Sequence, residues 1–399
     1  MPQEDVVALV RRLVAVDATN PSLVPGGAGE RELAGLIADW LEARGFEVRL
    51  VGRDPARPSV LARRRGSGGG GTLLLSGHLD TVGGSGVISD ASEDRSGDGS
   101  ADASGDRSAP ADRVLGRGAY DMAGGLAVAM VAAASAPDDL AGDLVLAFAA
   151  DEEFGSAGME DLLAALADGP RPNAAVVLEP TDLQVTVAHR GFAWFRVEYE
   201  GLAAHGSQPE LGVDAIARAT DGLIALRAFA DELHARPRHP LLGAGSVRVA
   251  TIEGGTDAAT VADRCALVIE RRTLPGEPDP GAELERVLAP SGAARIVPLV
   301  ARAAMETDPH AEIVRAVVDA VARATGAPAV RRGDPWWTDA GLLAEAGIPV
   351  ALVGPLGGGA HADEEWVSTA SLHTLVDVID GVIAAVCGEN GSHQRKEPS

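Results

Sequence analysis

The chain has 399 residues, of which 46% are hydrophobic, enough for more than one domain and a large buried core. Its formal net charge of −24 argues against nucleic-acid binding, because phosphate contacts need clustered lysines and arginines. The two cysteines, Cys265 and Cys387, lie far apart and form no CxxC pair, so neither a cysteine zinc site nor a disulfide framework is expected.

The N-terminal segment predicts an amphipathic helix, because apolar side chains recur at helical spacing through Val6, Val10 and Leu13. Glu4 and Asp5 precede this segment and no long apolar run follows, a pattern unlike that of a signal peptide. No stretch approaches the roughly 20 apolar residues that span a bilayer. We therefore expect a cytoplasmic protein that contacts no membrane.

Helical and strand-like segments alternate along the first part of the chain. The run LVLAFAA at 144–150 is apolar throughout, as in a strand that is buried on both faces. The alternation predicts an α/β domain, for which we expect a mixed sheet with helices on both faces. The expected helices cover 28–44, 124–135 and 158–167, and the expected strands cover 46–51, 72–78, 144–150 and 174–178.

After Pro180 the pattern changes to strands in which apolar and polar side chains alternate, as in half-exposed sheets. Together with one long helix, these strands predict a separate α+β insert. The expected strands cover 192–201, 246–254 and 265–274, and the expected helix covers 213–232.

Helices and strands resume after the insert and complete the first domain. We therefore assign 1–183 and 301–390 to that domain and 184–300 to the insert. The stretch 83–112 is rich in Ser, Gly and Asp and is expected to be a disordered loop, and 391–399 is expected to be a frayed tail.

Five short motifs lie at or after predicted strand ends, where open α/β sheets place their sites. In SGHLDT, His78 offers an imidazole nitrogen to a metal and Asp80 could hold the other ring N–H; a surface histidine is the alternative. In GRGAYDM, Asp121 could bridge two cations through its two oxygens, or could cap the helix expected at 124–135.

The strongest single motif is DEEFG, which places Asp151, Glu152 and Glu153 directly after the buried strand. Adjacent carboxylates repel one another and resist burial, so they need a compensating cation unless the run is simply solvated. One glutamate could bind a metal while the other takes a proton from water.

Two further motifs supply the remaining candidates. Glu179 closes an apolar strand, and His361 follows the glycines at 357–359. The motifs together offer two histidines and three carboxylates, a mixed nitrogen and oxygen set that suits zinc and also cobalt or manganese. A carboxylate shared by two ions would hold them roughly 3.5–4 Å apart.

Seven strings resemble, in the same order, a family of two-metal peptidases and deacylases that includes acetylornithine deacetylase, succinyl-diaminopimelate desuccinylase, aminoacylase and glutamate carboxypeptidase. They span 76–367 and read SGHLDTV, GRGAYDMAGG, DEEFG, LEPT, AAHGSQPELGVDAI, ERRTLPGE and GGAHADEEWV. The resemblance implies two divalent ions, with zinc as the expected metal and Asp121 as the bridging ligand. The implied ligands are His78, Asp121, Glu153, Glu179 and His361.

The same resemblance implies roles for further residues. Glu152 corresponds to the general base, and Asp80 to the residue that orients the ligand His78. The insert corresponds to a lid and dimerisation domain, in which His205 reaches the partner subunit's active site and stabilises an oxyanion, and Arg272 holds a substrate carboxylate. Each of these roles has an alternative: Glu152 as a surface neighbour of a ligand, His205 as the cap of a turn and Arg272 as the partner of a surface acid.

The chain also departs from the family's pattern. Ala123 stands where many relatives have lysine, Ala259 replaces an asparagine that contacts substrate, and Ala262 replaces a frequent proline. The polar stretch 83–112 replaces a segment that usually contains a tryptophan and a Pro-Phe pair. These changes spare the candidate metal ligands but leave the preferred substrate open.

We therefore expect a homodimeric, metal-dependent hydrolase that cleaves the amide bond of N-acyl amino acids, in the manner of acetylornithine deacetylase or succinyl-diaminopimelate desuccinylase. A dipeptidase or carboxypeptidase of the same family is the runner-up. A non-catalytic metal-binding homologue is the alternative from another class, and the intact pair Glu152 and Glu153 argues against it. Nucleotide binding is not expected, because neither GxxxxGK[ST] nor a strand followed by GxGxxG is present.

Overall fold

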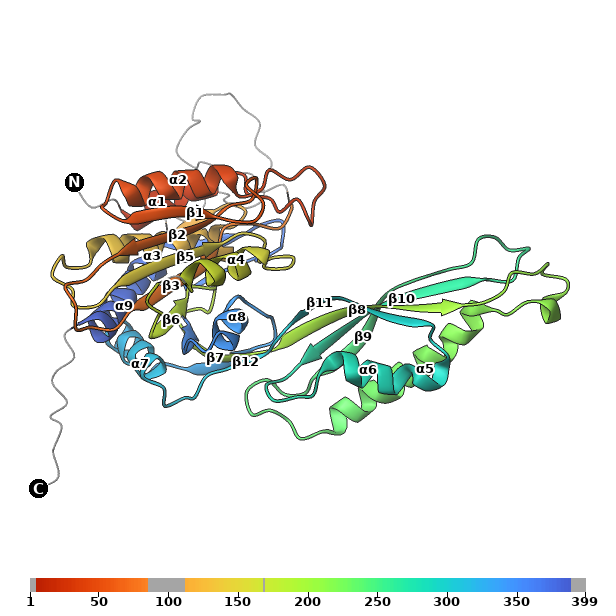
Figure 1. Cartoon of the computed structure of the whole chain (residues 1–399). Coiled ribbons are helices and arrows are strands. Elements are labelled where there is room, and N and C mark those ends of the chain that lie inside the picture. The colour runs from red at the N-terminus through yellow and green to blue at the C-terminus, as the bar shows by residue number, and fades with distance from the viewer. Residues whose placement is uncertain (1–4, 85–111, 168, 389–399) are drawn as a thin grey trace, which may run out of the picture. The chain divides into compact units, whose positions relative to one another are not determined.

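The computed structural model describes residues 5–84, 112–167 and 169–388. The tail 391–399 and most of the stretch 83–112, for which we expect disorder, lie outside these described residues. The chain forms two compact units, the second inserted into the first (Figure 1). Unit 1 comprises Met1–Val187, Thr307–Arg332 and Thr338–Ser399, and unit 2 comprises Ala188–Glu306 and Gly333–Trp337.

The larger sheet has nine strands in the order β1-β2-β5-β3-β6-β14-β7-β12, with β13 paired to β7. The sheet is mixed. Strands β5, β3, β6 and β14 run parallel to one another, whereas β2 is antiparallel to both of its neighbours, β1 and β5. Helices flank it, which confirms the expected fold class. The strands are β1 Glu47–Val51, β2 Ser59–Arg64, β3 Leu73–His78, β5 Leu144–Ala149, β6 Ala174–Val177, β7 Val185–His189, β12 Met305–Glu306, β13 Arg331–Asp334 and β14 Val350–Leu352.

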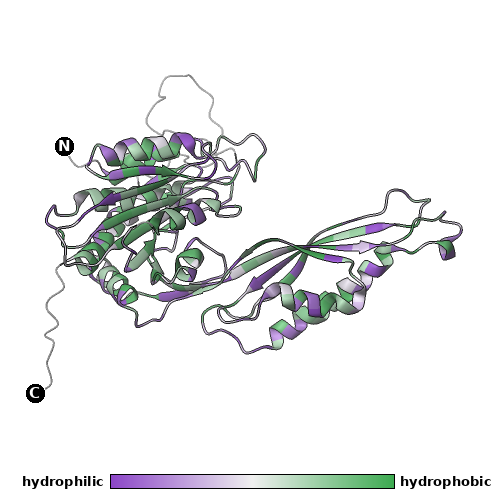
Figure 2. Cartoon of the chain, in the orientation of Figure 1, coloured by the Kyte–Doolittle hydropathy of each residue, from purple (hydrophilic) through white to green (hydrophobic). Residues whose placement is uncertain are grey.

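The central strands form the core because their sequences are apolar on both faces (Figure 2). Every residue of β3 and β5 is buried, as the continuous run at 144–150 predicts. The carboxyl ends of β3, β5 and β6 lie at one edge of the sheet, since these strands are parallel. The motifs that follow these strands are therefore brought to one place.

The helices of unit 1 pack on this sheet and on one another. Helix α3 is buried along almost its whole length, and α9 packs against both α3 and α7. The helices are α1 Val6–Val14, α2 Arg31–Glu42, α3 Gly124–Ser135, α4 Ala157–Leu166, α7 Glu312–Thr325, α8 Ala340–Glu345 and α9 Thr369–Cys387.

Among the described residues, α9 is long and apolar enough to cross a membrane by length and composition alone, although it contains His373, Asp377 and Asp380. One side of the helix is buried in the core of unit 1, through residues such as Leu375, Ile379 and Ile383. Its apolar character is therefore explained by packing against α3 and α7.

A second, three-stranded sheet in unit 1 was not predicted, because its strands are only two or three residues long. It pairs β4 Arg113–Leu115 with β16 Trp366–Ser368, and β16 with β15 Gly357–Gly358. This small sheet ties the segment that precedes Asp121 to the loop that contains His361.

Unit 2 is an α+β structure with a four-stranded antiparallel sheet of order β11-β8-β10-β9. One face of β8 contributes Phe195, Val197 and Tyr199 to a core with helices α5 and α6, whereas Arg196 and Glu198 on the other face are half-buried. The alternation predicted for 192–201 is thus observed. The elements are β8 Gly191–Glu200, α5 Ala215–Ala235, β9 Ser246–Gly254, β10 Arg264–Thr273, α6 Pro280–Leu288 and β11 Arg295–Arg302, with short turns at Pro209–Leu211 and Ala289–Ser291.

Candidate metal centre

The five candidate ligands all lie in unit 1 and gather at the carboxyl edge of its parallel strands. His78 is the last residue of β3, whereas Glu153 and Glu179 follow β5 and β6. Asp121 lies in the short turn Ala119–Ala123 that leads into α3, and His361 lies in the loop between β15 and β16.

Close packing of α3 on β6 brings Asp121 to this edge. A Cβ atom at Gly125 would lie 2.1 Å from the backbone oxygen of Leu178, so only glycine allows this approach. The glycine therefore holds the start of α3, and Asp121 before it, against the strand end that carries Glu179.

Asp121 lies between two pairs of side chains, each made of one histidine and one glutamate. Its Oδ1 is 3.0 Å from His78 Nε2, which is in turn 3.9 Å from Glu179 Oε1. Its Oδ2 is 3.4 Å from His361 Nε2, which is 3.2 Å from Glu153 Oε2. Each carboxylate oxygen of Asp121 thus faces a separate His–Glu pair, as a ligand shared by two ions would.

The chemistry of these residues fits a divalent cation. His78, Asp121 and Glu153 each offer a ligand atom, and these atoms lie within 4.8 Å of one another. Glu153 Oε1 is buried and has no hydrogen-bond partner among the described residues. Burial, together with the negative charges of Glu179 and Glu153, raises the pKa of Glu152 well above its ordinary value, although His78 opposes this. A bound cation would satisfy the free oxygen and offset the repulsion.

Asp80 does not contact His78 in the way we expect from the sequence. His78 Nδ1 lies 2.8 Å from the backbone oxygen of Asp80, whereas the nearest carboxylate oxygen is 3.7 Å away. Since a carbonyl only accepts, Nδ1 carries a proton, so a neutral ring would have its lone pair on Nε2, the nitrogen that faces Asp121. The ring orientation is therefore set by the backbone of Asp80 rather than by its side chain.

The Asp80 carboxylate instead holds the acidic turn after β5. It accepts hydrogen bonds from the backbone N–H groups of Glu152 and Glu153, at 3.0 and 3.1 Å. The side-chain amide of Asn20 also donates to it, at 2.8 Å. These three donors direct the carboxylate toward the turn, while the backbone oxygen of Asp80 contacts His78.

Sequence reasoning missed a group of buried residues that supports this turn. The same Asn20 amide nitrogen lies 3.2 Å from Asp151 Oδ1, and Arg57 pairs with both Asp151, at 2.8 Å, and Glu30. Asn20 and Glu30 are fully buried. No local signal marks them, because their partners are many residues away along the chain.

His205 lies in unit 2, exposed and with a defined ring orientation. The backbone N–H of Ser207 donates to its Nδ1 at 3.1 Å, so Nδ1 is the unprotonated nitrogen. The neutral ring therefore carries its proton on Nε2, which is left to donate elsewhere.

Arg272, also in unit 2, pairs with Glu270 at 2.9 Å, and its guanidinium lies 5.4 Å from the centre of the Phe192 ring. Arg190, which sequence reasoning did not single out, lies near it: burial and the positive charge of Arg272 lower the pKa of Arg190. Two neighbouring guanidinium groups favour an anion beside them.

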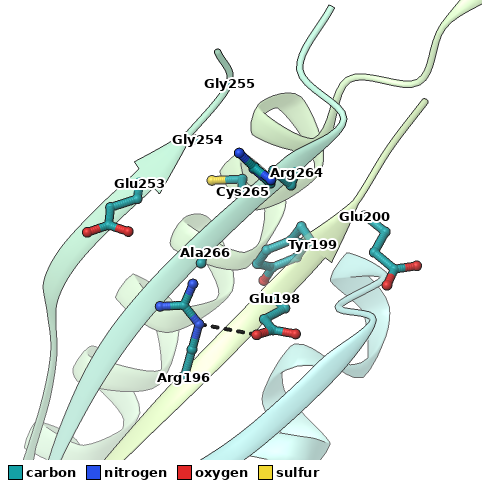
Figure 3. A pocket seen from close by; sticks show the side chains of 10 residues that line it. All are labelled: Arg196, Glu198, Tyr199, Glu200, Glu253, Gly254, Gly255, Arg264, Cys265 and Ala266. Atoms are coloured by element: carbon teal, nitrogen blue, oxygen red, sulfur yellow. Dashed lines mark hydrogen bonds and ion pairs between the residues drawn. The ribbon is translucent and has the colours of Figure 1, made fainter. Parts of the chain in front are cut away.

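Unit 2 also contains a cavity of about 390 Å³ between strands β8, β9 and β10. Figure 3 shows Arg196 and Glu198 side by side on its wall, joined by a hydrogen bond of 3.1 Å. None of the candidate site residues lines this cavity. Its wall charges are already paired in part.

Residues 74–385 match the model of peptidase family M20/M25/M40. Acetylornithine deacetylase from Myxococcus xanthus is 28% identical over 405 residues, which cover 96% of this chain and 97% of the relative.

Two solved structures share the fold. A metallo-carboxypeptidase of the M20 family from Sulfolobus solfataricus has a TM-score of 0.74 at 16% identity and covers 96% of this chain and 99% of its own. A dinuclear metal-binding M20 peptidase from Bacillus subtilis has a TM-score of 0.68 at 17% identity, with 96% and 97% covered. The family match spans most of the chain and includes all five candidate ligands, so the chain belongs to peptidase family M20/M25/M40 and is a metal-dependent hydrolase.

Proposed function

We propose that this protein is a two-metal deacylase that hydrolyses the amide bond of N-acyl amino acids. The observation that carries the proposal is Asp121, whose two oxygens face separate His–Glu pairs beside Glu152. The similarity to an acetylornithine deacetylase over nearly the whole chain supports this substrate class.

The ligand assignment follows the two pairs. His78 and Glu179 would hold one ion, His361 and Glu153 the other, and Asp121 both. Zinc is the proposed metal, with cobalt or manganese as alternatives, because the donor set is mixed nitrogen and oxygen. When bound, two such ions supply an acidified water and polarise the scissile carbonyl.

Glu152 is the proposed general base. Its backbone is fixed by Asp80, and it directly precedes the ligand Glu153. It takes a proton from the attacking water and returns it to the leaving amine, which makes it the acid in the second half of the reaction.

Two residues of unit 2 complete the proposed site. His205 donates its Nε2–H to the developing oxyanion, a role that the Ser207 contact favours because it leaves the proton on Nε2. Arg272 binds the carboxylate of the substrate, and the nearby Arg190 adds a second positive charge. An incoming carboxylate competes with Glu270 for Arg272, since these two residues are paired in the free protein.

The proposed assembly is a homodimer formed through unit 2. Strand β9 is an edge of its sheet, and Ile252 on it is 54% exposed. The neighbouring helix α5 exposes Ile216 and Ile224. An unpaired strand edge beside exposed apolar side chains favours pairing with a second copy. The cytoplasmic location expected from the sequence stays a prediction.

A dipeptidase or carboxypeptidase is the second candidate, since the structural relative from Sulfolobus solfataricus is a carboxypeptidase and the same metals and carboxylate clamp would serve it. Both reactions need the centre described above. Only the group on the acyl side of the scissile bond distinguishes them.

The test is a substrate panel for protein that has been stripped of metal and reloaded with zinc, cobalt or manganese. The panel contains acetylornithine, succinyl-diaminopimelate, dipeptides and longer peptides, and Glu152→Gln is the inactive control. Metal-restored cleavage of an N-acyl amino acid in preference to the peptides supports the deacylase. Preferred cleavage of peptides supports the second candidate, and no cleavage by protein with two bound ions indicates a non-catalytic homologue.

A further inference from the structure

Glu365 is a buried acid that no step of the proposed reaction uses. It is 3% exposed and immediately precedes β16, four residues after His361. Its carboxylate is not placed as a ligand, because other hydrogen bonds occupy it. These bonds all come from one short segment, Arg117–Asp121.

Each oxygen of Glu365 accepts two hydrogen bonds from that segment. Oε1 accepts the backbone N–H groups of Tyr120 and Asp121, at 3.0 and 2.9 Å. Oε2 accepts the backbone N–H of Gly118 at 2.9 Å and the Arg117 guanidinium at 2.8 Å. Hydrogen bonds to an ionised acceptor are the stronger kind, so four of them fix this segment closely.

The segment that Glu365 holds carries the shared ligand. Asp121 itself is one of the donors, and its backbone dihedral angles are non-helical although it lies in a helical turn. Without the carboxylate, the N–H groups of Gly118, Tyr120 and Asp121 would lose their partner at a buried place. The segment would then lose the contact that fixes it, and the Asp121 side chain would be held less closely.

The other side of the same contact is the loop of His361. Arg117 donates to the backbone oxygen of Ala362 at 2.6 Å, and the N–H of Gly116 donates to the backbone oxygen of Glu365 at 3.0 Å. His361 has a left-handed backbone with φ 63, and its side chain is 55% exposed. The loop is further held by the β4–β16 and β15–β16 pairings and by a hydrogen bond from the N–H of Ala362 to the Gly359 carbonyl, at 2.9 Å.

We propose that Glu365 is a positioning residue that holds Asp121 and His361 in register, and so sets the affinity for the ion that these two residues share with Glu153. The inference rests on the proposed function, from which it takes the ligand assignment. The ion at His78 and Glu179 also takes Asp121 as a ligand, but it does not use His361, and His78 lies on a strand that is paired on both sides. Loss of Glu365 should therefore weaken one of the two ions more than the other.

The experiment measures bound zinc per chain against free zinc by equilibrium dialysis and elemental analysis, for the full chain. The variants are Glu365→Ala and Glu365→Asp, and the matched control is Glu364→Ala, which removes an exposed acid at the neighbouring position. Circular dichroism shows that each variant is folded. The visible absorption spectrum of the cobalt-loaded proteins reports ligand geometry independently of activity.

The wild-type chain and the Glu364→Ala control are expected to bind two ions. Glu365→Ala should bind the ion at His361 and Glu153 about 10- to 100-fold more weakly, the usual cost of removing a residue that orients a ligand, and should weaken the other ion less. Glu365→Asp keeps a carboxylate and should recover part of that loss. Excess zinc should restore the activity of Glu365→Ala, whereas a misfolded protein would not recover.

A folded Glu365→Ala protein that binds both ions with wild-type affinity overturns the inference and leaves the proposed function intact. If Glu365→Ala does not fold, Glu365→Asp decides, because aspartate keeps the charge but is one methylene too short to make all four hydrogen bonds at their present distances. Unchanged affinity for the ion at His361 and Glu153 in that variant also overturns the inference. Wild-type protein that binds no pair of ions removes the proposed function, and this inference with it.

Discussion

Acidification should destabilise the folded chain through His189 in unit 2. The ring is fully buried: Nδ1 lies 3.0 Å from the backbone oxygen of Arg190, and Nε2 has no hydrogen-bond partner among the described residues. The ring of Trp337 packs edge-on against it, with 6.2 Å between the centroids. Burial lowers the pKa of His189 from 6.5 to about 4, and hydrogen bonds with the backbone offset this only in part.

The size of the effect follows from the two pKa values. Below pH 6.5 the unfolded chain takes up a proton at this histidine, whereas the folded chain keeps the ring neutral down to about pH 4. The free energy of unfolding is therefore not reduced by His189 above pH 6.5. It falls as the pH drops from 6.5 to about 4, and His189 causes no further change below that pH. The whole interval corresponds to about 3 kcal/mol, at 1.36 kcal/mol per pKa unit.

Urea unfolding of metal-free protein at pH 7.0 and 4.5 measures this effect in wild type and in His189→Gln. Carboxylates elsewhere contribute equally to both proteins and cancel in the comparison. Wild type should lose about 2 to 3 kcal/mol more than the variant between the two pH values. His234→Gln, which replaces an exposed histidine of α5, should behave as wild type. Equal losses in wild type and His189→Gln would refute the reasoning.

Other substitutions test single steps of the argument. His205→Ala should lower kcat about 100-fold with little change in metal content, as loss of an oxyanion donor does, and steady-state kinetics with metal analysis would show it. Arg272→Ala should raise KM for substrates with a free carboxylate but not for their amides; an equal effect on both would exclude a carboxylate clamp. Asn20→Ala removes the donor shared by Asp80 and Asp151 and should cost about 1 to 3 kcal/mol in denaturant unfolding. Chelation should lower Tm, and added zinc should restore it; a Tm indifferent to both would contradict a two-metal centre.

The fold class and the candidate ligands were accessible from the sequence because both depend on local patterns. Continuous apolar runs mark the parallel strands, and each run ends in a histidine or an acid at the edge where such strands place a site. The acids after β5 were informative because three adjacent carboxylates beside a buried strand need a cation.

The supporting contacts were not accessible, because they join distant parts of the chain. Asn20 reaches Asp80 and Asp151, and Glu365 reaches a segment about 245 residues earlier. The backbone contact between Asp80 and His78 was not accessible for a related reason. Whether the backbone or the carboxylate of Asp80 faces His78 depends on the turn after β5, which no local pattern specifies.

The boundaries of unit 2 differ from those of the expected insert. The boundaries fall inside the strands β7 and β13 and directly after β12, where the sequence pattern of apolar and polar residues does not change. Unit 2 begins at Ala188 and ends at Glu306, and it also takes the segment Gly333–Trp337, which the expected insert 184–300 does not include. That segment contributes Trp337, which packs on Phe192 and His189. A segment of only five residues is too short to show a pattern that would assign it to unit 2 from the sequence.

The pairing of β7 with β12 has a consequence for protein engineering. His189 and Met305 are register partners in adjacent antiparallel strands, so the chain leaves for unit 2 and returns from it at neighbouring points. A two-residue hairpin turn could therefore join these strands directly and delete the intervening residues. Polar residues in place of Trp336 and Trp337 would then make the newly exposed surface hydrophilic. The product would be a minimal scaffold that keeps every candidate metal ligand, into which other recognition domains could be grafted at the same junction.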